Sequence, residues 1–302
     1  MAATSRKRRP AAMRREALTG YLLISPNLIV FGVFMLLPLV LTFVISTQET
    51  SGLGPAEWVG LGNYTELVSD GIFWRSLINT IGYAAVTVPL GLALGLAVAM
   101  LLNNAVWLRD VMRTIYYLPV VISGVAAGLI AQWMFNENIG VVNELLGVVG
   151  LGPVSWQSSP IWAMTSVVLL TLWVGIGFNM VVYLAALQGI PREYYDASAV
   201  DGANSVQQFR HVTLPGLGTA TVFLAVYGVI LSFQAFDLIY ILTGGGPGNA
   251  TEVLGTYAYE QAFSARERGY GAAIGVVLYL LLVVVLGVQF WISRRRNPGE
   301  GR

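Results

Sequence analysis

Charge is scarce in this 302-residue chain, and three reactive residue types are absent or nearly so. There is no cysteine, which excludes disulfides and thiolate metal or redox sites. Lys7 is the one lysine, so the chain has no GxxxxGK[ST] phosphate-binding loop and cannot itself be an ATPase of that class. His211 is the one histidine, which leaves no histidine pair for a metal ion and no serine–histidine–aspartate arrangement within the apolar runs. These absences predict a chain without a catalytic or metal site.

What the chain has in abundance is apolar surface. Hydrophobic residues make up 56% of the sequence and charged residues only 11%, whereas soluble domains carry about 25% charged residues. A membrane-spanning helix needs roughly 20 mostly apolar residues. Six runs qualify, and they predict an all-α membrane protein with six transmembrane helices at residues 21–46, 77–102, 112–134, 161–188, 217–242 and 271–293. Gly91 and Gly95 form a GxxxG pair that favours close helix packing in the second run.

The basic residues predict how these helices are oriented. Six of the 17 lie within the first fifteen positions, and Arg294, Arg295 and Arg296 cluster near the other end. The loops 103–111 and 189–216 carry arginine, while 47–72 and 135–160 contain neither lysine nor arginine. Cytoplasmic loops carry an excess of basic residues, so both termini and the two arginine-bearing loops are expected in the cytoplasm. Arg75, Arg266 and Arg268 are exceptions.

This pattern divides the chain into a basic N-terminal tail (1–20), a six-helix membrane domain (21–293) and a basic C-terminal tail (294–302). The apolar run from Tyr21 to Ile45 is too long for a signal peptide and no small-residue cleavage site follows it, so it is expected to remain as the first span. Basic ends also occur in nucleic-acid-binding proteins, but beside apolar helices they favour membrane anchoring, and no nucleic acid is expected.

One polar segment, the loop 190–216, interrupts the apolar runs. Pro191 suits the start of a helix, and Glu193 and Asp196 place negative charge in its first turn. Gly202 and Asn204 predict its end. We therefore expect a short helix along the cytoplasmic face. A helix resting on lipid headgroups is the alternative, but such helices usually carry lysine or arginine opposite large apolar residues, so docking of another protein is favoured.

The same loop resembles the EAA motif of binding-protein-dependent ABC transporter permeases. That pattern is Glu-Ala-Ala, three residues, Gly, nine residues and Ile-x-Leu-Pro. Here Asp196-Ala197-Ser198, Gly202 and Val212-Thr213-Leu214-Pro215 stand at these positions, with Asp for Glu, Ser for Ala and Val for Ile. The flanking segments GLGNYTELVSDGIFWRSLINT, RTIYYLPVV, IPREYYDASAVDGA, FRHVTLP and LTGGGPGNAT are similar to carbohydrate-type permeases, in particular the first permease of maltose systems. Glycerol-3-phosphate permeases share these motifs.

This resemblance implies a type I ABC importer permease in the bacterial cytoplasmic membrane. A second, different permease, a pair of ATPase subunits and an extracytoplasmic solute-binding protein are then its partners, beside membrane lipid. ATP and magnesium belong to the ATPase, and the chain itself binds no cofactor. The resemblance assigns contact with the ATPase to Glu193, Asp196, Ala197, Ser198, Asp201, Gly202, Ala203, Leu214 and Pro215.

The resemblance also places a sugar or related polyol or glycerol-phosphate solute midway through the membrane. The matching positions are Thr171, Gly175, Phe178, Gly228 and Ser232, where hydroxyls, an aromatic ring and small residues suit a sugar, although ordinary helix packing explains each equally well. Asp237 is the one carboxylate within an apolar run, which fits a solute contact or a solvated group near the interface. No lysine or arginine lies mid-run, which favours a neutral sugar.

Two other classes compete with this hypothesis. An ATP-independent secondary transporter or channel typically shows inverted repeats and broken midplane helices, and no internal symmetry is evident here. A non-transporting membrane scaffold that recruits a cytoplasmic protein through its loop is the other. Only an importer permease is expected to co-purify with an ATPase and a second permease.

Overall fold

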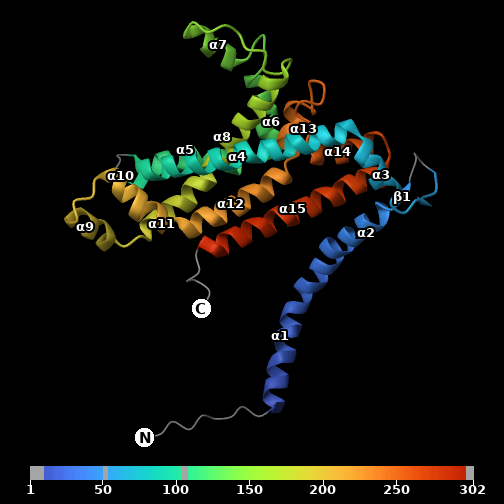
Figure 1. The fold of residues 1–302 in the computed structure, drawn as a ribbon, viewed down its shortest axis with the longest axis horizontal. Helices are drawn as coiled ribbons and strands as arrows, with labels where there is room; N and C mark the ends of the chain where they lie inside the picture. The colour runs from blue at the N-terminus through green and yellow to red at the C-terminus, as the bar shows by residue number, and fades with distance from the viewer. Residues whose placement is uncertain (1–9, 50–53, 104–107, 297–302) are drawn as a thin grey trace.

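The computed structural model describes residues 10–49, 54–103 and 108–296, and helices dominate this part of the chain (Figure 1). The predicted tails 1–20 and 294–302 lie partly outside the described residues. Helix α1 begins at Pro10 and α15 continues to Arg296. The strands in the described part are β1 (Gln48–Glu49) and β2 (Glu57–Trp58), which pair antiparallel as a short ribbon.

Four helices in the described part are long and apolar enough to cross a membrane unaided. The first is continuous from α1 (Pro10–Phe31) through a π-helical segment, η1 (Gly32–Leu36), into α2 (Leu37–Ile45). The others are α4 (Gly71–Asn103), α8 (Pro160–Gln188) and α15 (Arg268–Arg296). Their backbone groups pair within each helix, which is what the hydrocarbon region of a bilayer requires.

Two further candidate crossings are bent, and the predicted spans at these places are not continuous helices. The predicted span 112–134 is two helices, α5 (Arg109–Val121) and α6 (Gly124–Met134), which meet at an angle of 102°. Ile122 and Ser123 are extended between them, and the Ser123 hydroxyl caps α6 by accepting from the Ala126 N–H. An apolar run does not reveal this bend because both of its halves are apolar.

The predicted span 217–242 is likewise interrupted. Helix α12 (Gly218–Phe233) ends before Gln234, and α13 (Asp237–Leu242) begins after a three-residue break. On its other side, α12 meets the segment Ser205–Gly216 at 65°, and that pair passes as one bent crossing. The described part therefore contains four to six candidate spans. Asp237, predicted inside a continuous span, is instead the first residue of a new helix.

The remaining elements are short and connect the spans. At the end of the bundle that carries α9, the connections are α9 (Arg192–Val200), α10 (Ser205–Gln208), η2 (Phe209–Thr213) and α11 (Leu214–Gly216). Elsewhere they are α3 (Gly62–Ser69), α7 (Val141–Val148), α14 (Leu254–Tyr259) and η3 (Glu260–Ser264).

Close contact between α4 and α8 organises the centre of the bundle. The predicted role of the GxxxG pair is confirmed, because a Cβ atom added at Gly95 would overlap Cβ of Asn179, and one at Gly91 would lie 3.2 Å from its Nδ2. Elsewhere on α8, Gly177 lets α5 approach so closely that an added Cβ would overlap the Tyr116 carbonyl oxygen. Small residues thus set the positions of α4, α5 and α8.

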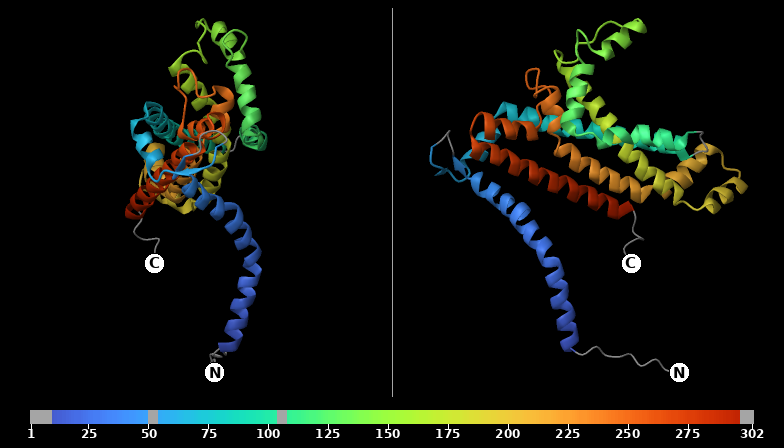
Figure 2. Two further views of the ribbon diagram at one scale, coloured as in Figure 1. Left: turned by 90° about the vertical axis from the view of Figure 1, so that its right-hand side faces the viewer. Right: turned by 180° about the vertical axis from the view of Figure 1, so that it is seen from behind.

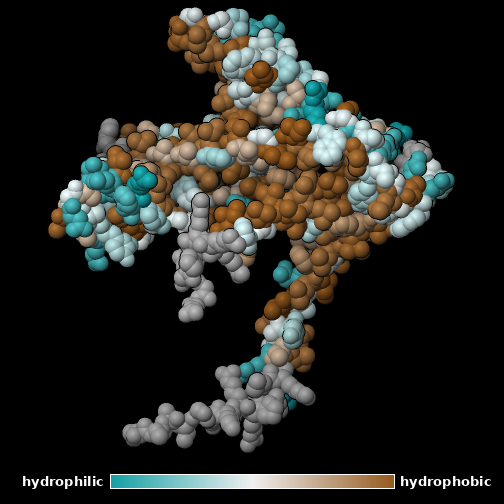
Figure 3. All heavy atoms as spheres, in the orientation of Figure 1, coloured by the Kyte–Doolittle hydropathy of each residue, from teal (hydrophilic) through white to brown (hydrophobic). Residues whose placement is uncertain are grey.

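Helix α1 extends away from this bundle in every view, whereas α2 meets it at α15 (Figures 1 and 2). The most apolar part of this span has no buried residue, although its mean hydropathy is as high as that of a helix in a protein core. Figure 3 shows hydrophobic side chains along the long helices and hydrophilic ones at the end that carries α9. Lipid or another subunit is needed to cover so much apolar surface.

At the opposite end of the bundle, Asp70 joins three elements. Its Oδ2 accepts hydrogen bonds from the hydroxyls of Tyr257 on α14 (2.5 Å) and Tyr270 on α15 (2.6 Å), and its Oδ1 accepts from the Ile72 N–H at the start of α4. Burial raises the pKa of Asp70, but these hydrogen bonds outweigh it and hold the pKa below its ordinary value. The carboxylate form thus stabilises this junction.

Replacing Asp70 with Asn should lower the midpoint of thermal unfolding of the purified protein at neutral pH, because a neutral amide accepts these hydrogen bonds more weakly. A lowered folded-state pKa stabilises the fold above the ordinary carboxyl range, and that stability is lost as the pH falls through the folded value. The difference between the wild type and D70N should therefore shrink in acid. Fluorescence-monitored melting across pH measures it.

The matched control is Glu66→Gln, which changes an exposed carboxylate on α3 and should leave the midpoint unchanged at every pH. A D70N deficit that stays constant into strong acid would contradict a role for the ionised carboxylate.

Candidate functional site

The loop 190–216 folds as the sequence predicts at its start. Helix α9 begins directly after Pro191, whose missing N–H is of no consequence there. Glu193 lies in its first turn, next to the free N–H groups of the helix N-terminus, whereas Asp196, which was predicted in that turn too, lies in the second turn. Both Glu193 and Asp196 are exposed, so the helix presents its negative charge to its surroundings.

The end of α9 depends on Gly202, as predicted. Gly202 has φ +78°, which side chains strongly disfavour. This turn lets the Ala203 N–H reach the Ser198 carbonyl oxygen (2.9 Å) and the Gly202 N–H reach that of Ala199 (3.0 Å). The role predicted for Asn204 is wrong, because it caps the next helix. Its side chain accepts from the Gln207 N–H at 3.0 Å while the Gln207 side chain accepts from the Asn204 N–H.

Helix α9 has no buried residue, so a few polar contacts hold it to the bundle. The Tyr195 hydroxyl lies 3.0 Å from the hydroxyl of Thr213, which is buried in η2. The Gln208 side chain donates to the Ser198 hydroxyl (3.1 Å) and to the Tyr195 carbonyl oxygen (3.3 Å). Tyr195, Gln208 and Thr213 were not singled out from the sequence, since nothing local distinguishes them from other polar loop residues.

A groove with a volume of about 970 Å³ runs beside α9. It lies between this helix, the end of α8 and the beginning of α12. Of the residues predicted to contact an ATPase, four line it together, namely Ala197, Ser198, Asp201 and Pro215. Glu193, Asp196, Gly202 and Leu214 are exposed near it, and Ala203 is half-buried.

The second candidate site is a cavity of about 370 Å³ inside the bundle. It is lined by α4, α8, α12 and α13, and all six residues predicted for the solute pathway border it: Thr171, Gly175, Phe178, Gly228, Ser232 and Asp237. The residues thus come together from two apolar runs that are separate in the sequence. No lysine or arginine is among the described residues that line it.

Helix α4 supplies the polar partners that the sequence did not reveal. The Tyr83 hydroxyl lies 2.8 Å from that of Thr171, and the Thr87 hydroxyl lies 3.2 Å from that of Ser232. The ring of Phe178 packs against Tyr227 with centroids 4.8 Å apart. Asn179 and Gln234 also line the cavity, and an amide within an apolar run is the one sequence signal that would have pointed to them.

Both breaks in the spans border this cavity. Gly124, at the first break, and Gln234, Ala235, Phe236 and Asp237, at the second, are among its lining residues. The Asp237 carboxylate lies against the beginning of α6, where a Cβ added at Gly124 would be 2.7 Å from Oδ2. Irregular backbone at membrane depth is tolerated where it is buried in protein or lines a cavity, so the two breaks and the cavity form one feature.

Nothing in the described residues suggests a catalytic centre. No group of three or more histidine, cysteine, aspartate or glutamate side chains is placed to hold a metal ion there.

These features agree with the relatives of the chain. The model of the family described as binding-protein-dependent transport system inner membrane component matches residues 87–298. The chain belongs to this family. It is a permease subunit of an ABC importer and a component of the inner membrane.

The relatives cover nearly the whole chain. The sulfoquinovosyl glycerol transport permease SmoG of Agrobacterium fabrum is 36% identical over 285 residues, 93% of this chain and 92% of that protein. The trehalose/maltose transport permease MalF of Thermococcus litoralis is 34% identical and covers 94% of this chain and 96% of its own length. The lactose transport permease LacF of Rhizobium radiobacter is 34% identical and covers 98% and 100%.

A solved structure shares the fold. The bacterial ABC transporter involved in import of the acidic polysaccharide alginate superposes with a TM-score of 0.81 at 25% identity, covering 94% of this chain and 98% of that one.

Replacing Tyr195 with Phe should weaken the attachment of α9 to η2 without changing the helix propensity of the segment, because it removes only the hydroxyl that reaches Thr213. One such hydrogen bond contributes about 1 kcal/mol, so amide hydrogen exchange across residues 192–200 should quicken about fivefold. Hydrogen-exchange mass spectrometry measures this. Tyr194→Phe is the control, since Tyr194 is 61% exposed. Equal exchange in the two variants would show that the Tyr195 hydroxyl does not hold the helix.

Proposed function

We propose that this permease subunit passes a neutral sugar through the cavity between α4, α8, α12 and α13. The composition of the cavity wall supports this proposal, because it combines aromatic rings, hydroxyls and amides with no cation. Rings stack on the apolar faces of sugars, and hydroxyls and amides pair with their oxygens. The relatives are named for sugar-containing solutes: sulfoquinovosyl glycerol, trehalose or maltose, and lactose. A glycerol phosphate solute would need a cation from another subunit.

In this proposal α5 with α6 forms one crossing and α12 with α13 forms another, and together with the four long helices they give six spans. Both termini, the α4–α5 connection and the loop 190–216 then lie in the cytoplasm, because these parts carry most of the basic residues. The tails 1–20 and 294–302 flank the membrane domain 21–293. Arg75 is an exception with a structural role. It lies at the end of the bundle opposite α9, where its Nη1 donates a hydrogen bond to the Gly248 carbonyl oxygen.

The proposed partners are a second, different permease, two ATPase subunits and an external solute-binding protein. A solved alginate importer that is 24% identical was determined with a bound periplasmic protein. The unburied first span offers a surface for the second permease or for lipid. This chain hydrolyses no ATP, and ATP and magnesium act at the ATPase.

The contacts of α9 suggest how a movement of the ATPase is transmitted to the cavity. An ATPase that moves α9 pulls on Thr213 through Tyr195 and on α10 through Gln208. These residues lead through η2 and α11 into α12, which carries Gly228 and Ser232 on the cavity wall. Movement of α9 thereby shifts one wall of the cavity against α4 and α8, as alternating access requires.

Replacing Asp196 with Arg should abolish ATP-driven uptake while the chain still inserts and assembles. Asp196 is exposed and makes no contact that the fold needs, so the effect should come from the ATPase interface. Uptake and ATPase activity are measured in proteoliposomes with the complete importer. Val148→Arg on α7, where the side chain is 83% exposed, is the control and should leave uptake unchanged. Undiminished uptake by D196R would rule out the coupling role, and the proposed set of partners is tested by co-purification of an ATPase and a second permease.

Replacing Gly175 with Leu should block the cavity without distorting the fold, since no atom lies within 4 Å of an added Cβ. When a sugar occupies the cavity, the added leucine side chain overpacks it. Overpacking costs about 1–3 kcal/mol, so sugar binding and with it uptake should fall about tenfold or more. The measurement is uptake of labelled trehalose, maltose and lactose. Gly82→Leu, at an exposed glycine of α4 with the same free space, is the control. Normal uptake by G175L would remove the cavity from the pathway.

A further inference from the structure

Two arginines at the start of α5 converge on a single neutral side chain. Arg109 and Arg113 lie one helical turn apart, and both reach Gln188, the last residue of α8. With its amide oxygen turned towards them, Gln188 accepts from Nη2 of Arg109 at 2.7 Å and from Nη2 of Arg113 at 3.2 Å. Two positive charges thus share one acceptor that has no net charge, so neither of them is neutralised by it.

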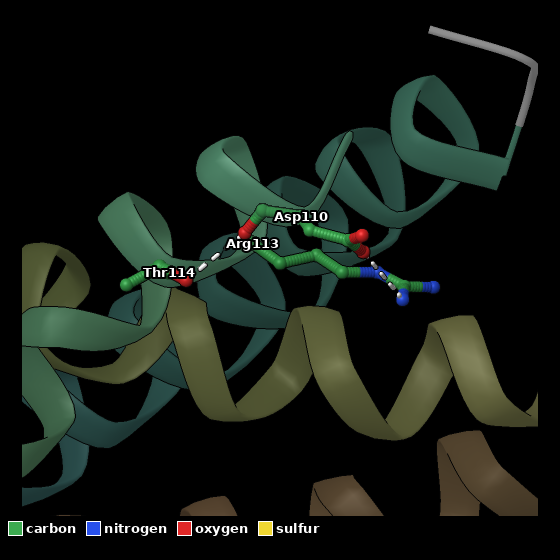
Figure 4. A network of polar contacts seen from close by, with 3 residues as sticks. All are labelled: Asp110, Arg113 and Thr114. Carbon is green, nitrogen blue, oxygen red and sulfur yellow. Dashed lines mark hydrogen bonds and ion pairs between the residues drawn. The ribbon is translucent and has the colours of Figure 1, made fainter. Parts of the chain in front are cut away.

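The nearby acidic group is a weak partner. Figure 4 shows the Arg113 side chain extending towards the Asp110 carboxylate, and Oδ1 of Asp110 lies 3.5 Å from Nη1 of Arg113. The Asp110 side chain is 93% exposed, so solvent screens this pair. The Thr114 hydroxyl is engaged with the Asp110 carbonyl oxygen at 2.9 Å.

The guanidinium groups are also short of acceptors. The Nε atoms of Arg109 and Arg113 are both buried, and neither has a hydrogen-bond partner. Each guanidinium has five N–H donors, and buried donors normally find partners. The arrangement therefore has both positive charge and donors to spare.

Position identifies the kind of anion that fits. Figure 1 places the start of α5 at the same end of the bundle as α9 and α10. Along α5, apolar side chains next to the arginines are exposed, namely Val111 (49%), Ile115 (57%) and Leu118 (58%). A helix face of this kind lies against lipid tails, which puts its first turn at the depth of the headgroups. The free N–H groups of that turn add to the positive potential.

We propose that Arg109 and Arg113 form a binding site for a phosphate group, supplied by the headgroup of an anionic lipid. Phosphate oxygens match the donor fork of a guanidinium group. Because Gln188 directly precedes Gly189 and the loop 190–216, a phosphate held by the same arginines steadies the start of that loop. Lipid binding rests only on the geometry of α5 and α8, whereas an effect on transport also rests on the proposed function.

Native mass spectrometry of the complete importer tests binding. The importer is reconstituted in phosphatidylcholine nanodiscs with or without phosphatidylglycerol. It is then released from the nanodisc inside the mass spectrometer, so that the lipids that stay bound can be counted. The wild type should retain phosphatidylglycerol, and the double variant Arg109→Gln/Arg113→Gln should retain on the order of tenfold less. Arg15→Gln, which removes an exposed arginine at the start of another span, is the matched control and should retain as much as the wild type. The double variant Arg109→Lys/Arg113→Lys, which keeps the charge but not the fork, should fall between the two.

Three results would overturn the proposal. Equal retention by the wild type and the glutamine double variant would show that the arginines hold no lipid. Loss of subunits from the complex, with lipid retention unchanged, would assign the arginines to an acidic side chain of a partner subunit. If inorganic phosphate added in pure phosphatidylcholine stabilises the wild type against heat as well as phosphatidylglycerol does, and fails with the glutamine variant, the ligand is free phosphate rather than lipid.

The transport arm separates this proposal from the proposed function. Phosphatidylglycerol should stimulate ATPase activity and uptake severalfold in the wild type and R15Q but not in the glutamine double variant. If uptake of every labelled sugar is absent while lipid retention still depends on the arginines, the proposed solute is wrong and the lipid site stands.

Discussion

The hydrocarbon region of a bilayer offers no hydrogen-bond partner to a peptide group, and this constraint shapes the whole molecule. It explains why α4, α8 and α15 run for up to 33 residues without interruption. It also explains where the backbone departs from helix. The breaks after Val121 and after Phe233 both border the internal cavity, where neighbouring protein can satisfy the freed groups. The need to pair every backbone group thus explains why these two breaks lie beside the cavity and not on the surface that faces lipid.

The two candidate sites are separate: the groove lies beside α9, and the cavity lies between α4, α8, α12 and α13. Helix α9 has no buried residue, and Tyr195, Gln208 and Thr213 connect it to η2 and through η2 to α12. Few packed side chains therefore hold α9 in place, which is what the proposed coupling to a partner requires. The end of α9 is fixed by the positive φ of Gly202, so its length does not change as it moves.

Charge is scarce in this chain, and the surroundings of four charged side chains show how it is used. Asp70 holds α4, α14 and α15 together at one end. Arg75 fastens the loop after α13 through the Gly248 carbonyl oxygen. Arg109 and Arg113 meet at Gln188, next to the loop that carries α9, and lack a strong acidic partner. The first two are satisfied within the chain, whereas the arginine pair needs an anion from outside it.

The sequence by itself determined the apolar helices, the family and the short helix of the loop 190–216, because run length, composition and residue spacing are local properties. It also grouped Thr171, Gly175, Phe178, Gly228, Ser232 and Asp237 correctly around one cavity, but only through the resemblance to known permeases. Tertiary structure decided the bend at Ser123 and the break that begins at Gln234, since neither changes the apolar pattern. It also decided the partners of the polar groups: Tyr83 meets Thr171 across 88 residues, and Tyr195 meets Thr213 across 18. Such pairings depend on how helices pack against one another, and no local pattern records them.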